Sequence, residues 1–314
     1  FGKLGLGLGL GGGGGAKLDP ATVAYIQRVE ADGGNVINKA LTDSIIKAIK
    51  ADGAWDYVHS IYTSISGIKL DENNYVTKLY DVMGATNDLT SVGTTNKPQH
   101  DVEDRRINGL PAITFVSASS QYLGSNVSNN DNNGMIISVQ RSASTARQAI
   151  SSGYIDNSFY GEGASGKLIT GSEPGGNASA EVFEPGLRLV SLTKIASKNY
   201  IFTSNGVTLG QSDDSGWRVA HKLALGACLQ ANPSLFFDGE IAAHITLTSA
   251  PASIAGTLSK LNEIFAICGG AMPAIFTFTS KGANTGTLSL FYPESENGKI
   301  VKATGNVKLG AGGN

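Results

Sequence analysis

The sequence predicts a mainly β protein, an antiparallel sandwich with a small N-terminal helical region and a C-terminal β-hairpin extension. Glycine supplies 41 of the 314 residues, and charged residues make up only 16% of the chain. Many short strands joined by Gly, Ser and Asn turns give such a composition, whereas a helical bundle does not. From about residue 109 the apolar residues also recur with the period of two that is typical of half-buried strands.

A Leu/Gly-rich segment opens the chain over residues 1–18. Leu4, Leu6, Leu8 and Leu10 alternate with glycines, so an extended strand would carry all four leucines on one face. The glycines that follow would act as a flexible tether. The pattern fits either a disordered tail or an arm that becomes ordered by adding a strand to a neighbouring subunit. We predict an assembly arm.

A helical leader and linker is predicted over residues 19–108. Asp19 and Pro20 are typical of a helix N-terminus, and this first helix runs to about Ala31. A second helix follows, and its apolar residues recur at helical spacing. A third, short helix is expected around residues 55–61, and the remainder of the leader is mixed and polar.

A sandwich is predicted over residues 109–269, closed by an amphipathic helix over 251–268. Clusters of Asn, Ser and Gly separate its strand-like apolar runs at the spacing typical of antiparallel sandwiches. These runs are 112–117, 134–140, 148–155, 180–183, 187–195, 200–204, 222–229 and 236–247. Residues 270–314 are predicted to form a tail of β-hairpins.

Several segments resemble a known family. Residues 113–123 are similar to the opening strand of concanavalin A-like (laminin G-like) jelly rolls, and residues 237–245 with the helix after them are similar to the closing strand and terminal helix. Residues 18–33 and 50–55 resemble the helical leader of such jelly rolls in bacteriophage and prophage virion proteins, in tail or minor structural components. The resemblance covers roughly residues 18–269 and implies a concanavalin A-like jelly roll.

The charge and cysteine content exclude several classes of protein. The 24 basic and 26 acidic residues give a net charge of −2, whereas nucleic-acid binding needs a concentrated basic face. No apolar stretch is long enough to span a membrane, so no membrane insertion is expected. Two cysteines, Cys228 and Cys268, are too few for a disulfide scaffold, and we predict that both are buried thiols.

The sequence carries no recognisable catalytic motif. A glycoside hydrolase needs two carboxylates roughly 5 to 10 Å apart. Glu181 and Glu184 would face opposite sides of a strand, and Glu103 and Asp104 lie in a charged loop. The stretch 161–167 matches a phosphate-binding loop only in part, because a strand and not a helix is expected after it. We therefore expect no enzyme.

One loop resembles a ligand site. Asn129, Asp131 and Asn133 stand at the first, third and fifth positions of a calcium loop, but Gln140 replaces the bidentate Glu. The segment could contact a glycan, or it could simply be a turn in which Asn adopts positive φ. The four histidines, His59, His100, His221 and His244, lack metal-ligand spacing. We expect neither a metal nor a cofactor.

Together these observations predict a non-enzymatic structural protein of a phage virion, in the tail, a fibre or the head decoration. Its partners would be other virion proteins and copies of itself, and its location would be the virion, assembled in the bacterial host cytoplasm. An alternative is a lectin-like module that binds host or surface glycans, and a third is a glycoside hydrolase. An exposed aromatic platform with Asn or Asp neighbours on the concave sheet face would favour glycan binding.

Overall fold

The computed structural model describes residues 17–267, except 92, 94, 95, 105, 106, 108, 126, 128–133, 145, 154–158, 163–167, 172–175, 179–186, 197, 198, 206, 214–221, 230, 231 and 266. The chain divides into two compact units, Phe1–Ile267 and Cys268–Asn314, and the elements below belong to the first. The predicted hairpin tail lies outside the described residues, as does the arm except for its last two residues.

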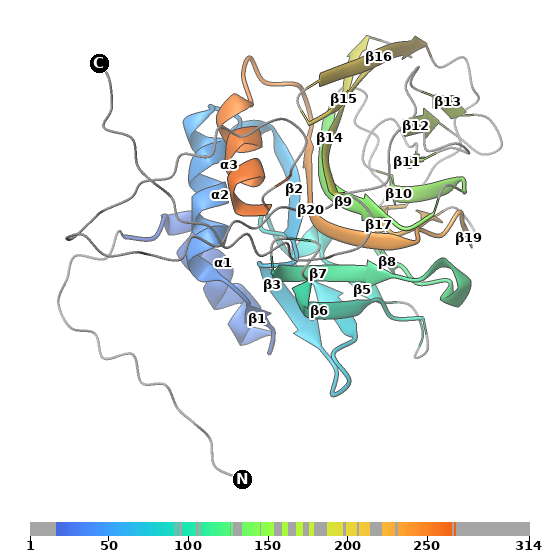
Figure 1. Cartoon of the computed structure of the whole chain (residues 1–314). Coiled ribbons are helices and arrows are strands. Elements are labelled where there is room, and N and C mark those ends of the chain that lie inside the picture. The colour runs from blue at the N-terminus through green and yellow to red at the C-terminus, as the bar shows by residue number, and fades with distance from the viewer. Residues whose placement is uncertain are drawn as a thin grey trace, which may run out of the picture. The chain divides into compact units, whose positions relative to one another are not determined.

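The described part of the first unit is mainly β, which confirms the predicted fold class: an antiparallel jelly-roll sandwich with a small N-terminal helical region (Figure 1). Its helices are α1 (Pro20–Ala31), α2 (Lys39–Ala51) and α3 (Ala255–Phe265), with short 3-10 turns at Trp55–Tyr57, Ala85–Asn87 and Ser117–Ser119. None of the described helices is both long and apolar enough to cross a membrane.

Two large antiparallel sheets form the sandwich. The described residues place ten strands in one sheet, in the order β1 (Asn35–Val36), β3 (Gly67–Leu70), β4 (Val76–Leu79), β5 (Leu89–Ser91), β8 (Leu123–Gly124), β17 (Ala224–Leu225), β10 (Gln148–Ser152), β11 (Phe159–Glu162), β12 (Leu168–Gly171) and β13 (Gly176–Ala178). The second sheet has the order β16 (Val207–Asp213), β15 (Asn199–Ser204), β14 (Leu187–Ala196), β9 (Met135–Ser142), β20 (Gly239–Leu247), β7 (Leu110–Phe115) and β6 (Gln99–Asp104), and β2 (Val58–Thr63) also pairs with β20. Strands β18 (Cys228–Leu229) and β19 (Pro233–Ser234) pair separately.

The sheets begin well before residue 109. The predicted third helix is only the turn Trp55–Tyr57, after which β2 starts at Val58. The predicted linker contains β3 to β6. Strands β3, β4 and β5 belong to the ten-stranded sheet, and β6 belongs to the eight-stranded sheet. These strands are short, and bulges interrupt the pairing of β3 with β4 and of β6 with β7. A bulge breaks the alternation of apolar and polar residues on which a sequence-based strand prediction depends.

Side chains cap the first turns of α1 and α2. The Asp19 carboxylate accepts a hydrogen bond from the Ala21 backbone N–H at 2.8 Å, and the Asn38 side chain accepts one from Leu41 N–H at 3.0 Å. Each cap therefore satisfies a backbone donor that the first helical turn leaves unpaired. The buried stripe of α2 includes Ile45.

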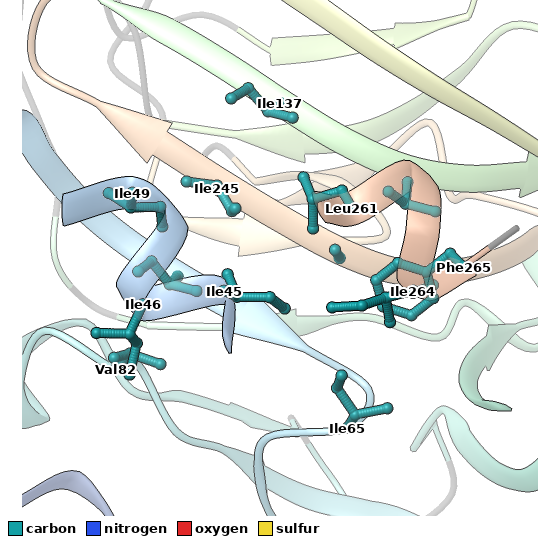
Figure 2. Close-up of a cluster of buried hydrophobic side chains, with 14 of the residues drawn as sticks. Ile45, Ile46, Ile49, Ile65, Val82, Ile137, Ile245, Leu261, Ile264 and Phe265 are labelled. Carbon is teal, nitrogen blue, oxygen red and sulfur yellow. The ribbon is translucent and has the colours of Figure 1, made fainter. Parts of the chain in front are cut away.

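The apolar face of the helical layer packs on the outer face of the eight-stranded sheet. Ile49 of α2, Ile245 of β20 and Leu261 of α3 meet in one buried cluster (Figure 2). A second cluster fills the space between the two sheets, where the rings of Phe115 and Phe237 lie edge to face at 6.2 Å.

Asp52 fastens α3 to α2. Its carboxylate accepts hydrogen bonds from the backbone N–H of Gly256 at 3.1 Å and of Thr257 at 2.7 Å, and from the Thr257 hydroxyl. A residue at the end of one helix thereby caps the start of another. A side chain at position 256 would bring its Cβ within 2.7 Å of the Asp52 carboxylate, so this approach favours glycine.

Asp81 is a fully buried carboxyl group beside the helical layer. Its Oδ1 accepts hydrogen bonds from the backbone N–H of Ile61 at 2.8 Å and of Met83 at 3.2 Å. Its own N–H donates to Asp88, which forms an ion pair with Arg28 of α1 at 3.0 Å. Burial raises the pKa of Asp81 to about 7, although the two backbone donors act in the opposite direction.

We predict that Asp81 makes the protein less stable as the pH rises from about 4 to 7. The folded protein retains a proton that the unfolded chain, with an ordinary pKa of 3.8, has already released. Thermal unfolding of the wild type and of Asp81→Asn should be compared at about pH 5 and about pH 8. The wild type should lose more stability between the two than the variant; equal losses would contradict the prediction.

Candidate functional site

The residues predicted from the sequence to take part in assembly or ligand binding lie outside the described part of the chain. This holds for the arm leucines Leu4, Leu6, Leu8 and Leu10 and for the loop residues Asn129, Asp131 and Asn133. The same is true of Glu181, Glu184, His221 and Cys268. Both the arm and the ligand loop therefore stay predictions.

Two of the described histidines and the described cysteine are core residues. His244 is fully buried, and burial lowers its pKa to about 3. The ring of His100, also buried, lies 3.1 Å from the Ser64 carbonyl oxygen through Nε2, and Cys228 is fully buried. Within the described residues, no three His, Cys, Asp or Glu side chains gather in a metal-binding arrangement.

The face between the sheets is not an open platform where the structure describes it. The apolar cluster that contains Phe115, Leu192 and Phe202 fills it. The two most distinct voids among the described residues, one beside Ile46 and one beside Ile241, are too small for a water molecule. A ligand surface has to be sought on an outer face.

Strand register brings five side chains into line on the outer face of the eight-stranded sheet. Residues paired directly across antiparallel strands point to the same side. The pairs Tyr75–Gln99, Gln99–Thr114, Thr114–Glu240 and Glu240–Arg141 therefore form one continuous line across the segment before β4 and strands β6, β7, β20 and β9. We call Tyr75, Gln99, Thr114, Glu240 and Arg141 the polar row.

A rigid turn holds Tyr75 at one end of the polar row. Asp71 Oδ1 accepts hydrogen bonds from the backbone N–H of Asn73 and of Tyr75, each at 3.0 Å, and Asp71 Oδ2 contacts Lys97 Nζ at 2.8 Å. The hydrogen bond with Lys97 lowers the pKa of Asp71. Asn74 adopts positive φ, +62°, as a tight turn requires.

Tyr75 is 38% exposed, and its register partner is Gln99, which is also exposed. The backbone bonds on either side of this pair, from Val76 N–H to Pro98 O at 2.8 Å and from His100 N–H to Asn74 O at 2.9 Å, make it a non-hydrogen-bonded pair. Side chains approach most closely in such pairs. An exposed aromatic ring and an exposed amide therefore stand side by side.

An ion pair closes the other end of the polar row. Arg141 Nη1 donates to Glu240 Oε2 at 2.8 Å, with the Glu240 side chain 3% exposed and that of Arg141 26% exposed. The guanidinium thus faces the surface above a buried carboxylate. Thr114 lies between this pair and Gln99 and is partly exposed.

The polar row lies next to residues that the helices cover. Ala112 and Val139 share the face with Thr114 and Arg141, two residues further along their strands, and both belong to the cluster that contains Phe265 of α3. Leu187 of β14, which pairs with Arg141, also packs against this cluster.

No family model and no curated protein sequence match the chain. A GH54 α-L-arabinofuranosidase is similar in structure, with a TM-score of 0.48, 10% identity, and coverage of 71% of this chain and 65% of that enzyme. The CBM40 of the Ruminococcus gnavus IT-sialidase, bound to α2,3-sialyllactose, gives 0.32, 15%, 41% and 81% in the same order. Domain 4 of AbnA, a GH43 arabinanase from Geobacillus stearothermophilus in complex with arabinotriose, gives 0.43, 14%, 67% and 98%. This chain spans less than two thirds of the first of these proteins.

These comparisons contradict the expected role as a structural protein of a phage virion. The similar structures are a glycosidase, a carbohydrate-binding module and an arabinanase domain in complex with its sugar. At these low identities the likeness concerns the fold, so the function is argued below from the polar row.

Proposed function

We propose that the protein is a non-catalytic carbohydrate-binding β-sandwich that holds a glycan on the polar row. The observation that carries this proposal is the exposed ring of Tyr75 beside the exposed amide of Gln99. This is the combination of an aromatic platform with amide neighbours that favours glycan binding, found on the outer face of the sheet and not on the concave one.

The chemistry of the polar row suits a sugar. An aromatic ring offers a flat apolar surface to the C–H face of a pyranose, and Tyr adds a hydroxyl group at its tip. The Gln99 amide can both donate and accept hydrogen bonds, as can the Thr114 hydroxyl, so both suit sugar hydroxyls. The row is built on paired strands and a braced turn, so little side-chain and backbone freedom is lost on binding.

The polar row does not provide the acid and base of a glycosidase. Hydrolysis needs two carboxyl groups on either side of the scissile bond, and Glu240 is the only carboxylate among the five residues. That carboxylate is buried and in an ion pair with Arg141. Bound polysaccharide should therefore stay intact, and a reducing-end assay would detect cleavage.

We predict that Tyr75→Ala weakens binding to neutral polysaccharides by at least roughly tenfold, the effect of losing about 1.4 kcal/mol of binding free energy. Affinity electrophoresis of the full chain against a panel of soluble polysaccharides measures this. Tyr57→Ala is the matched control, because Tyr57 is a similarly exposed tyrosine, 43%, outside the polar row. Equal binding by the two variants, or cleavage of the polysaccharide by the wild type, would contradict the proposal.

A further inference from the structure

We propose that residues 81–88 form a cover over the outer edge of strand β2, and that this cover opens locally as the pH rises while the sandwich stays folded. The cover is the segment between β4 and β5 and contains the 3-10 turn Ala85–Asn87. It includes no residue of the polar row, so its opening does not depend on glycan binding. Its contacts with β2, its attachment to α1 and the carboxyl group buried within it support this device.

The cover takes the place of a neighbouring strand along β2. Among the described strands, only β20 pairs with β2, and the opposite edge of β2 contacts the cover. There the Ile61 N–H donates to Asp81 Oδ1 at 2.8 Å, and the Val82 N–H donates to the Ile61 carbonyl oxygen at 3.1 Å. The Asn87 side-chain amide donates to the His59 carbonyl oxygen at 3.2 Å. An uncovered strand edge would leave these backbone groups to water or to another chain.

The cover can open without separating any strand from its sheet. It contains no strand of its own, and two of the three hydrogen bonds given above are made by its side chains. Val82 packs near Ile46 of α2 (Figure 2), whereas Ala85 and Thr86 are exposed. A segment with few buried apolar contacts opens at a lower free energy than the core strands.

Arg28 of α1 keeps the cover closed. Its Nη1 lies 3.0 Å from Asp88 Oδ2, and its Nη2 donates to the Asp81 carbonyl oxygen. Lys78 of β4 also forms an ion pair with Asp88 at 3.0 Å, and the Asp81 N–H donates to Asp88 Oδ1 at 2.9 Å. The Asp88 side chain is only 5% exposed, so removing Arg28 would leave a buried carboxylate with one cation fewer.

The Asp81 carboxyl group makes closure of the cover depend on pH. It is fully buried, and burial raises its pKa to about 7. In the open cover the group would be solvated, with an ordinary pKa of 3.8. Opening therefore releases a proton between about pH 4 and 7, so it becomes more favourable as the pH rises across that range and levels off above it.

The other charged and titratable groups around Asp81 come from four elements. Asp88 of the cover raises the pKa of Asp81 further by its negative charge, and Arg28 and Lys78 form ion pairs with Asp88. The other titratable groups on the elements packed against Asp81 are Tyr25, Glu30 and the C-cap Asp32 of α1, Tyr80 beside β4, and His59 and Tyr62 of β2. Asn at position 81 keeps an oxygen that can accept the Ile61 N–H but does not titrate, so Asp81→Asn separates Asp81 from all of these groups.

The test is hydrogen–deuterium exchange of the full chain, followed by NMR at about pH 5 and about pH 8 and corrected for the intrinsic exchange rates. We expect the protection of the Ile61 amide to fall by roughly tenfold or more between the two pH values. The Ile137 amide of β9, which pairs with strands on both sides, should stay better protected at both. In Asp81→Asn the protection of Ile61 should depend much less on pH.

Arg28→Ala should lower the protection of Ile61 by roughly tenfold at both pH values, because the cover loses its attachment to α1. Lys39→Ala is the matched control. Lys39 pairs with Glu30 at 2.7 Å, and both side chains are about half exposed, so its removal breaks a surface ion pair of the helical layer and should leave the protection of Ile61 unchanged.

Each measurement can overturn the proposal. Equal protection of Ile61 and Ile137 in the wild type would mean that Ile61 exchanges only when the whole unit unfolds, and that the cover is not a separate device. A pH dependence of Ile61 that persists in Asp81→Asn would overturn the role of Asp81, and unchanged protection in Arg28→Ala would overturn the attachment to α1. The first comparison uses the wild type alone, so it decides the proposal even where a variant does not fold.

Discussion

Replacing Phe265 by alanine should lower the free energy of unfolding by about 3–5 kcal/mol. Phe265 is fully buried, and it lies in the cluster that joins α3 to α2 and to the outer face of the eight-stranded sheet (Figure 2). Truncation removes the transfer free energy of the ring and leaves a cavity that helices anchored at Asp52 can only partly close. Denaturant titration measures the loss.

Leu258→Ala is the control for this prediction. Leu258 lies on the same helix but is only partly buried against the cluster, so its truncation should cost clearly less than that of Phe265. A Phe265→Ala variant within about 1 kcal/mol of the wild type would mean that α3 does not depend on this contact.

Gly239→Ala should damage the eight-stranded sheet at a cost of roughly 3 kcal/mol or more. A Cβ at position 239 would lie 2.1 Å from the Arg141 carbonyl oxygen and 3.0 Å from Ser142 Cα, and both are backbone atoms of β9. The φ of Gly239 is also +147°, which other residues rarely adopt. Strands β20 and β9 must move apart, and the ion pair of Glu240 with Arg141 must change with them.

Gly109→Ala separates the two causes. Gly109 has a φ of +69°, but nothing lies within 4 Å of the position that its Cβ would take, so this variant carries only backbone strain. It should cost about 1 kcal/mol and leave glycan binding unchanged. Gly239→Ala should lower both the unfolding midpoint and the affinity for glycan, and equal costs for the two variants would argue against the clash.

The sequence predicts the elements whose signals are local. Asp19 and Pro20 mark the start of the first helix, and the Asp19 cap is formed. Strands β9, β14 and β20 are long enough for alternation to identify them. Strand β5 has three residues and β3 contains a bulge, so neither carries a period that can be read without its partner strands.

The polar row could not be predicted from the sequence for a different reason. Tyr75 and Arg141 lie far apart in the chain, and only the register of three further strands brings them onto one line. Register depends on how the whole sheet pairs, and a shift of one residue would send Thr114 to the opposite face. One local signal was present: the Asp71–Tyr75 segment has the Asp and Asn residues of a tight turn that ends in an aromatic residue.

The pairing of β2 with β20 also sets the order in which the protein can fold. The hydroxyl groups of Ser60 and Thr246 meet at 2.7 Å across a separation of 186 residues, and Asp52 caps a helix that starts about 200 residues later. Contacts so distant in the chain close large loops and slow folding. On the ribosome, α1, α2 and β2 emerge long before β20 and α3 exist to cover them. The apolar face of the helical layer therefore stays exposed to solvent until synthesis has passed Phe265. Folding of this unit is then a late event that involves nearly all of its chain.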